Sequence, residues 1–156
     1  VYLYGKEHGL CWTSLRYANV YGPRQDPYGE AGVVSIFCQN LLEGVAPEIH
    51  WDGEQTRDFL YVEDCAHANL LALHAGDGRA YNVGTGVGTS INELFRVLVE
   101  VSGRDVEPRR GPRRAGDARH SYLDCSKIER ELGWQAEVSL REGLHATLDH
   151  LASGQA

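Results

Sequence analysis

The sequence predicts an α/β fold, because segments with strand character alternate along it with segments of helical period. Aromatic and β-branched residues between turn residues mark the strand-like segments, which are 11–20, 47–51, 58–62, 80–84 and 121–124. Apolar residues at helical spacing, or helix caps, mark the helix-like segments, which are 1–8, 33–43, 63–75, 90–101, 126–132 and 140–151. No internal repeat or low-complexity linker interrupts this alternation.

The limits of these helices follow from their end residues. Gly9 and Gly44 end the first two, and Ser90 with Glu93 three residues later predicts a capping box for the fourth. The apolar stripe of the 63–75 helix is expected to consist of Ala66, Leu70, Leu71 and Leu73.

Length and composition favour a single globular unit. The 156 residues suffice for one core, and 42% hydrophobic and 24% charged residues lie in the range of soluble domains. No apolar run approaches the roughly 18 residues of a membrane span, and the first residues lack the pattern of a signal peptide. The chain contains no methionine, so we expect its natural start to lie upstream.

Charge and metal-ligand spacing exclude two kinds of function. A net charge of −7 argues against general binding of nucleic acid. The four cysteines are scattered, without a CxxC pair, and the seven histidines form no HExxH pattern. We therefore expect reduced, mostly buried thiols and no metal site.

One basic segment stands out in this acidic chain, the run RRGPRR at 109–114. Guanidinium forks suit phosphates and a nearby carboxylate suits ribose hydroxyls, so Arg57, Arg114 and Asp117 are candidate ligands of a nucleoside diphosphate. The alternatives are a solvated loop and a surface ion pair between Arg57 and Asp58, which would stabilise little.

Catalytic motifs are not evident. NVGTG at 82–86 lacks the GxGxxG spacing and is interpreted as a turn before a helix. Tyr2 and Lys6 stand four apart, but Gly9 and a strand follow them closely. A catalytic Tyr-Lys pair would lie earlier on a longer helix, so we interpret this spacing as coincidence. No nucleophile elbow or pair of catalytic carboxylates is present.

Six blocks in order along the chain resemble the extended short-chain dehydrogenase/reductase family, and within it the UDP-glucose 4-epimerases. The blocks are LRYANVYGPRQDP, GEAGVVSIF, DGEQTRDFLYVED, YNVGTGVGTSINEL, RRAGDARHSYLDCSKIERELGW and VSLREGL. The resemblance implies that residues 1–156 form the C-terminal part of a Rossmann-type enzyme, with the last Rossmann strand segments and a small mixed α/β substrate-binding domain. The NAD-binding part would then be missing, and all catalytic residues would lie upstream of Val1.

The resemblance also implies binding roles for particular residues. Tyr17, Ala18 and Val20 match the segment along the nicotinamide end of NAD, and Asn19 matches the asparagine that contacts the diphosphate and sugar. Val33 and Val34 open the helix whose N-terminal N–H groups approach the nucleotide. Many relatives carry a side-chain amide at the position of Val33, so only the backbone would serve here.

Five further positions complete the expected substrate site. Arg57 and Arg114 match phosphate-binding arginines and Asp117 a ribose-binding carboxylate. Trp51 replaces a glycine of IFGDGEQ and either stacks on the uracil or crowds it. Ser121 matches the position near the sugar C2 substituent, where a small side chain leaves room for an N-acetyl group. A second departure from the family, GWQA in place of GWxP, is expected to affect only a turn.

The resemblance implies the nucleotide-sugar-binding portion of an NAD-dependent UDP-glucose 4-epimerase, inactive by itself and cytoplasmic. The intact enzyme would be a homodimer that acts on a UDP-sugar, without nucleic-acid or membrane partners. The alternatives are a sugar 4,6-dehydratase or UDP-glucuronate decarboxylase on the same scaffold, and a non-catalytic nucleotide-sugar-binding fragment. In each case the first strand would belong to a parallel sheet of the missing part, so we expect exposed apolar surface and an unpaired strand edge.

Overall fold

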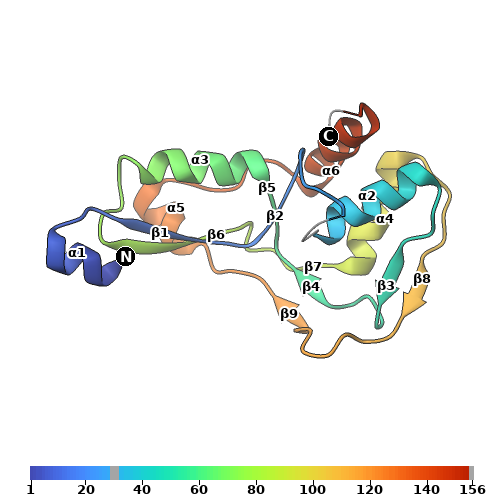
Figure 1. Cartoon of the computed structure of the whole chain (residues 1–156), viewed down its shortest axis with the longest axis horizontal. Helices are drawn as coiled ribbons and strands as arrows, with labels where there is room; N and C mark the ends of the chain where they lie inside the picture. The colour runs from blue at the N-terminus through green and yellow to red at the C-terminus, as the bar shows by residue number, and fades with distance from the viewer. Residues whose placement is uncertain (29–31, 155–156) are drawn as a thin grey trace.

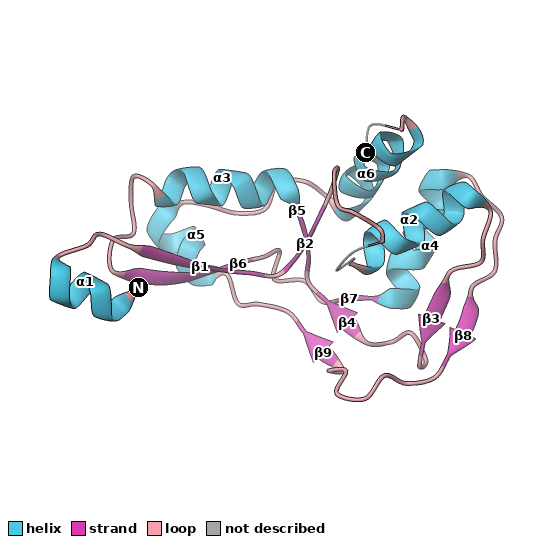
Figure 2. Cartoon of the chain, in the orientation of Figure 1, coloured by secondary structure: helices cyan, strands magenta, loops and turns pink. Residues whose placement is uncertain are grey.

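The computed structural model describes residues 1–28 and 32–154, and it has two ends of different character (Figure 1). One end contains the long strands β1 and β6 with helices α1, α3 and α5 around them. The other contains helices α2, α4 and α6 beside the short strands β3 and β8 (Figures 1 and 2). The predicted α/β class is confirmed.

The described residues form helices and strands in an alternating order. The helices are α1 (Tyr2–His8), α2 (Val33–Glu43), α3 (Val62–Ala72), α4 (Ile91–Ser102), α5 (Ser126–Leu132) and α6 (Leu140–Ala152). The strands are β1 (Thr13–Tyr17), β2 (Asn19–Tyr21), β3 (Glu48–His50), β4 (Thr56–Arg57), β5 (Phe59–Tyr61), β6 (Arg79–Val83), β7 (Thr89–Ser90), β8 (Arg109–Gly111) and β9 (His120–Ser121).

The strands pair in small sheets that are mostly parallel. β1 pairs with β6, β2 with β5, and β3 with β8, each in parallel. β4 lies between β7, which is antiparallel to it, and β9, which is parallel. Parallel pairing requires a crossover, and α3 lies in the chain between β5, which pairs with β2, and β6, which pairs with β1.

Each end of the molecule has its own apolar core. The larger core joins α2, α4 and α6 to β2, β3 and β5, and Leu41, Leu94, Leu98 and Leu144 are fully buried in it. The smaller core lies between β6, α3 and α5, and its largest fully buried side chain is Trp134. The Trp134 indole N–H donates to the carbonyl of Asp64, so the turn after α5 is fixed to the start of α3.

The structure corrects several predicted limits. The single strand expected over 11–20 is two strands, because the chain passes at Ala18 from its pairing with β6 to its pairing with β5. Ser90 caps α4 by accepting the N–H of Glu93. The Glu93 carboxylate instead contacts Arg96, so only half of the capping box is described at this helix. A complete capping box occurs at Ser139 and Glu142.

The predicted apolar stripe of α3 is confirmed at Leu71, which packs against the smaller core, and is wrong at Ala66, Leu70 and Leu73. Leu70 and Leu73 are 61% and 75% exposed, whereas the buried residues of the helix are Asp64, Cys65 and Ala68. The helix packs Cys65, Ala68 and Leu71 inward, whereas Leu70 points outward. Single exposed leucines are common, but Leu70 and Leu73 add to the apolar side chains exposed at this end of the molecule.

The expected strand edge and apolar surface are confirmed in the described part of the chain. β1 pairs there with β6 alone, which leaves its other edge without a strand. Apolar side chains are exposed at the same end of the molecule. They are Val1, Tyr2, Leu3, Tyr4, Leu10, Tyr17, Leu70 and Leu73. Aggregation through this surface stays a prediction.

Candidate functional site

A polar cavity of about 290 Å³ lies at the end of the molecule that holds the larger core. Its lining residues come from segments far apart in the sequence and include five predicted site residues. They are Asn19, Gly32, Val33, Phe37, Glu48, His50, Gln55, Arg57, Ile91, Arg114 and Asp117.

Asn19 reaches this cavity because of the way the first strand changes partner. β1 ends at Tyr17, the N–H of Ala18 donates to Val83 at the end of β6, and the N–H of Asn19 donates to the carbonyl of Asp58. The residue therefore follows the carboxyl ends of a parallel strand pair, where ligands bind in open α/β sheets. The side chain of Asn19 is exposed in the cavity.

The N-terminus of α2 forms another side of the cavity. Gly32 is the N-cap residue and has no side chain to accept a hydrogen bond from the first turn. Gly32 and Val33 line the cavity, while Val34 is buried in the larger core. A helix N-terminus favours an anion through its N–H groups and its dipole, so Val33 offers its backbone and Val34 contributes packing.

Arg57 and Asp117 meet across the cavity as an ion pair. Their side chains are only 17% and 24% exposed, so the pair is partly shielded from water. Nη1 of Arg57 also donates to the carbonyls of Thr56 and Ala118, at 2.7 and 2.9 Å. A guanidinium has five N–H donors, so donors remain for a phosphate oxygen.

Asp58 does not pair with Arg57, which excludes the surface ion pair considered from the sequence. Its carboxylate is buried and accepts hydrogen bonds from the N–H of Thr85, Gly86 and Leu123 and from the Thr85 hydroxyl. One side chain thus joins the start of β5 to the turn after β6 and to the segment after β9. The NVGTG segment is accordingly a structural turn, as predicted.

Arg114 lies in the long loop between β8 and β9 and lines the cavity. The carbonyl of Arg114 accepts the N–H of Asp117 at 3.3 Å, so a turn sets both side chains on the cavity side. The side chain of Arg114 makes no hydrogen bond or ion pair with the rest of the described chain. It is the arginine of the loop best placed to meet an incoming anion.

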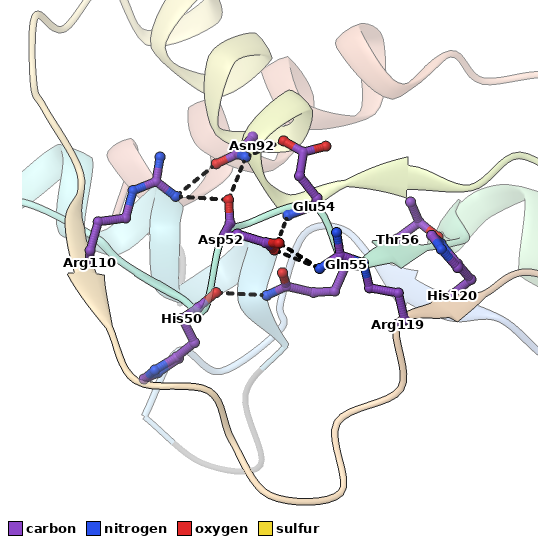
Figure 3. Close-up of polar contacts among 9 residues, drawn as sticks. All are labelled: His50, Asp52, Glu54, Gln55, Thr56, Asn92, Arg110, Arg119 and His120. Atoms are coloured by element: carbon purple, nitrogen blue, oxygen red, sulfur yellow. Dashed lines mark hydrogen bonds and ion pairs between the residues drawn. The ribbon is translucent and has the colours of Figure 1, made fainter.

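The other arginines of this segment contact the protein itself. Arg110 donates to Asn92 and to the carbonyl of Asp52, and Arg119 donates to both carboxylate oxygens of Asp52 (Figure 3). The Arg119 hydrogen bond and the N–H of Glu54 lower the pKa of Asp52 below its ordinary value. Within the basic run 109–114, Arg110 is therefore engaged by the protein, whereas Arg114 is available for a ligand.

Trp51 does not line the cavity. Its ring lies under two guanidinium groups, at 4.2 Å from Arg113 and 4.5 Å from Arg119, measured from each guanidinium carbon to the ring centroid. The backbone of Trp51 has φ of 60°, a value that a bulky residue rarely adopts. Whether Trp51 stacks on the base or crowds it stays a prediction. The structure shows in addition that the Trp51 ring contacts Arg113 and Arg119.

The remaining predicted residues lie outside the cavity lining. Tyr17 is exposed and donates its hydroxyl to Asn69 at 2.8 Å, while Val20 packs against the smaller core. Ala18 lies between them at the carboxyl end of β1. Ser121 is exposed in β9, where it pairs with Arg57. Its position beside Arg57 places it near the cavity without lining it.

Six cavity residues were not predicted as site residues from the sequence. They are Gly32, Phe37, Glu48, His50, Gln55 and Ile91. Glu48 and His50 could have been paired from the sequence, because side chains two residues apart in a strand point to the same face of the sheet. Gln55 is buried and donates its side-chain amide to the carbonyl of His50 at 3.0 Å, a contact between segments that the sequence does not reveal.

Other candidates from the sequence do not form a second site. Tyr2 and Lys6 lie on α1, at the opposite end of the molecule from α2 (Figure 1). The Lys6 ammonium lies 5.7 Å from the centroid of the Tyr2 ring. In the described residues no cluster of three or more metal-ligating side chains occurs. The cysteines are free, and two of them are buried. None of the described helices is both long and apolar enough to cross a membrane.

The arrangement is suited to a nucleoside diphosphate. Arg57, Arg114 and the start of α2 direct positive charge into one cavity, where phosphates need charge-assisted hydrogen bonds. The Oδ2 atom of Asp117 makes no hydrogen bond to the described residues and can accept one from a ribose hydroxyl. Phe37 and Ile91 add apolar surface beside these polar groups.

Comparison with known proteins gives matches over nearly all of this chain. The family model described as "NAD dependent epimerase/dehydratase family" matches residues 1–84. A putative UDP-glucose 4-epimerase of Methanocaldococcus jannaschii is 47% identical over 142 residues, which cover 91% of this chain and 46% of that protein. Relatives of lower identity include a dTDP-glucose 4,6-dehydratase of Streptomyces antibioticus.

Two solved structures show the same fold over nearly all of this chain. The UDP-glucose 4-epimerase of Thermotoga maritima with UDP-glucose matches with a TM-score of 0.95 and 51% identity. The matched region covers 99% of this chain and 50% of the Thermotoga chain. The UDP-glucose 4-epimerase of Thermus thermophilus in complex with NAD has a TM-score of 0.87 and 42% identity, covering 95% and 49%. The chain thus spans about half the length of the proteins it matches. By its family match and its fold, the chain belongs to the NAD dependent epimerase/dehydratase family, in which its relatives are Rossmann-type enzymes.

Proposed function

We propose that this chain is the nucleotide-sugar-binding portion of an NAD-dependent UDP-glucose 4-epimerase, which interconverts UDP-glucose and UDP-galactose. The observation that carries the proposal is the meeting of Asn19, Arg57, Arg114 and Asp117 around one cavity at the N-terminus of α2. The relatives named as UDP-glucose 4-epimerases, one of them solved with UDP-glucose, support the choice of ligand.

The proposed division of roles follows from the charges. Arg114 and the N–H groups at the start of α2 hold the diphosphate, and Arg57 shares its guanidinium between a phosphate and Asp117. Asp117 accepts a ribose hydroxyl, and Asn19 lies toward the sugar. Epimerisation requires the hexose to turn over, so binding energy placed on the diphosphate holds the substrate while the sugar stays free to rotate.

NAD is the proposed cofactor, and the carboxyl end of β1 suits its nicotinamide end. Tyr17, Ala18 and Val20 flank Asn19 where β1 passes into β2, which supports a cofactor position next to the sugar. When bound, NAD would supply the oxidation at C4 of the sugar. The residues of this chain orient the substrate toward that position, and the catalytic tyrosine and lysine belong, in this proposal, to the part of the enzyme before Val1.

The nearest alternative is another reaction on the same scaffold, a sugar 4,6-dehydratase or a UDP-glucuronate decarboxylase. All of these reactions require binding of a nucleoside diphosphate, so binding alone does not distinguish them. Product analysis of the longer protein distinguishes the three reactions. Conversion of UDP-glucose to UDP-galactose supports the proposal, whereas release of a 4-keto-6-deoxy sugar or of carbon dioxide contradicts it. A non-catalytic binding module would bind UDP and convert none of these sugars.

Calorimetric titration of the chain with UDP tests the binding role directly. We expect saturable binding, and a decrease in affinity of about 10- to 100-fold in Arg114→Ala, because a hydrogen bond to a charged group contributes about 1.5–3 kcal/mol. Arg109→Ala is the matched control, since Arg109 belongs to the same basic run but contacts the carbonyl of Ala46 outside the cavity. Equal affinities of the wild type and Arg114→Ala would remove the phosphate role of Arg114.

Ser121 is proposed to set tolerance at the sugar C2 substituent. A small side chain at this exposed position of β9 leaves space that a tyrosine would fill. In the longer protein we expect Ser121→Tyr to suppress turnover of UDP-GlcNAc while turnover of UDP-glucose is retained. A parallel loss of both activities would contradict the assignment, and Ser121→Ala serves as the size-matched control.

We further propose that the intact enzyme is a cytoplasmic homodimer with no membrane or nucleic-acid partner. The net charge of −7 supports the exclusion of nucleic acid. Light scattering of the longer protein measures its oligomeric state.

A further inference from the structure

The loop 112–119 between β8 and β9 contains two residues of the proposed nucleotide-binding site, Arg114 and Asp117, yet it has no regular secondary structure. Arg113 and Arg114 are exposed. A loop with few buried contacts is ordered only by the particular contacts that hold it. Arg57 holds the later part of this loop through Asp117 and the carbonyl of Ala118, so another contact has to hold the part around Arg114.

Trp51 contacts the loop near both of its ends. The guanidinium of Arg113 lies 4.2 Å from the centroid of the Trp51 ring, and that of Arg119 lies 4.5 Å from it. Arg113 directly precedes Arg114, and Arg119 stands two residues after Asp117. The two ligands thus lie between two arginines that meet on a single indole ring.

Neighbouring contacts reinforce this arrangement. The backbone N–H of Trp51 donates to the carbonyl of Gly111 at 2.9 Å, which fixes the ring beside the start of the loop. Arg119 also donates to both oxygens of Asp52, the residue after Trp51 (Figure 3). Arg119 is thereby oriented while its guanidinium lies over the ring.

The backbone conformation of Trp51 provides a second, independent observation. Its φ of 60° lies in the left-handed region, which favours glycine and is strained for a bulky side chain. A strained residue persists where the surrounding structure holds it, and such residues gather at functional sites. A tryptophan at this position is best explained by the contacts of its ring.

We infer that Trp51 is a positioning residue, which clamps the loop 112–119 through Arg113 and Arg119 and so presents Arg114 to the nucleotide, while Arg57 holds Asp117. This inference rests on the proposed function for the identity of the ligand. It assigns to Trp51 an action through the loop, with no direct contact to a base. The order of the loop itself is measurable without any ligand.

The first test uses UDP titration of Trp51→Gly, which removes the ring and suits the left-handed backbone. Two exposed cation–π contacts correspond to a loss of about 5- to 30-fold in affinity. The melting temperature should change little, because relief of backbone strain offsets the lost stacking. Trp51→Phe retains an aromatic face and should restore most of the affinity. Wild-type affinity in Trp51→Gly would overturn the inference.

A double-mutant cycle separates clamping from base stacking. If Trp51 acts through Arg114, the double variant Trp51→Gly/Arg114→Ala binds UDP little more weakly than Arg114→Ala alone. Additive losses would mean that the indole contacts the nucleotide itself, which overturns the positioning role.

Limited trypsin digestion without nucleotide keeps this test separate from the proposed function. Trypsin cleaves after arginine, so the bonds that follow Arg113 and Arg114 report on the loop. We expect these bonds to be cut several-fold faster in Trp51→Gly than in the wild type, with Trp51→Phe between them. Equal cutting rates would overturn the clamp. A wild-type chain that fails to bind UDP but shows this protection would contradict the proposed function alone.

Discussion

The two ends of the molecule differ in how completely they bury their apolar surface. At the cavity end, α2, α4 and α6 close around one core, and the exposed segments there are polar and rich in arginine. At the other end, β1 and β6 form a two-stranded parallel sheet, and Leu70 of α3 and Leu73 directly after it remain exposed. The residues proposed to bind the nucleotide lie at the end where the helices enclose the core. A closed core can hold polar side chains in fixed positions, whereas the other end retains surface suited to further packing.

Asp58 connects these two ends, and its loss should have the largest effect. Asp58→Ala leaves the N–H groups of Thr85, Gly86 and Leu123 without their acceptor in a buried site. We expect a decrease of about 3–5 kcal/mol in the free energy of unfolding, measured by urea denaturation.

Asp77→Ala is the control for this change, since Asp77 is exposed at the β1–β6 end and its replacement should stay within about 0.5 kcal/mol. Similar effects of the two substitutions would show that the buried carboxylate does not join the two ends.

A matched pair of leucines measures the difference between the two ends. Leu144 is fully buried in the core of the cavity end, and Leu73 is 75% exposed at the other. Leu144→Ala should lower the free energy of unfolding by about 2–5 kcal/mol, through lost burial and a residual cavity. Leu73→Ala should change it by less than about 0.5 kcal/mol. A large effect of Leu73→Ala would mean that this leucine is covered in solution, for instance by a second copy of the chain.

The smallest expected effect is electrostatic and belongs to the cavity end. Hydrogen bonds from Arg119 and from the N–H of Glu54 lower the pKa of Asp52 below the ordinary value of 3.8. A group with a lowered pKa in the folded state stabilises the protein above its unfolded pKa. This contribution is lost as the pH falls through the folded value.

Unfolding of the wild type and Asp52→Asn at about pH 6 and at decreasing pH measures this contribution. The difference between them should be small at about pH 6, because the pair is exposed, and should vanish in acid. A difference that grows as the pH falls would contradict the assignment.

Much of the site was predictable because its chemistry lies in short segments. Arg57, Arg114, Asp117, Asn19 and Val33 were all predicted and all line one cavity. The pattern of helix caps and glycine stops also placed α2 and α5 at their observed limits. Capping and turn formation depend on residues a few positions apart, so the sequence contains that information directly.

Other features required contacts between distant segments. Asp58 was considered as a partner of its neighbour Arg57, but its acceptors are used by Thr85, Gly86 and Leu123. The outward position of Leu70 and Leu73 also contradicted the helical pattern, because the sheet takes the face with Cys65 and Ala68. A one-dimensional pattern cannot show which face of a helix meets a neighbour when both faces carry apolar residues.

The sequence by itself determined the alternation of strands and helices, the family, and the residue types that suit a diphosphate and a ribose. These follow from local spacing and from charge, which are properties of the chain alone. Only the tertiary structure decided that Arg57 pairs with Asp117 and that Trp51 meets Arg113 and Arg119. Those contacts join residues about 60 positions apart, and a chain brings such residues together only when its cores have formed.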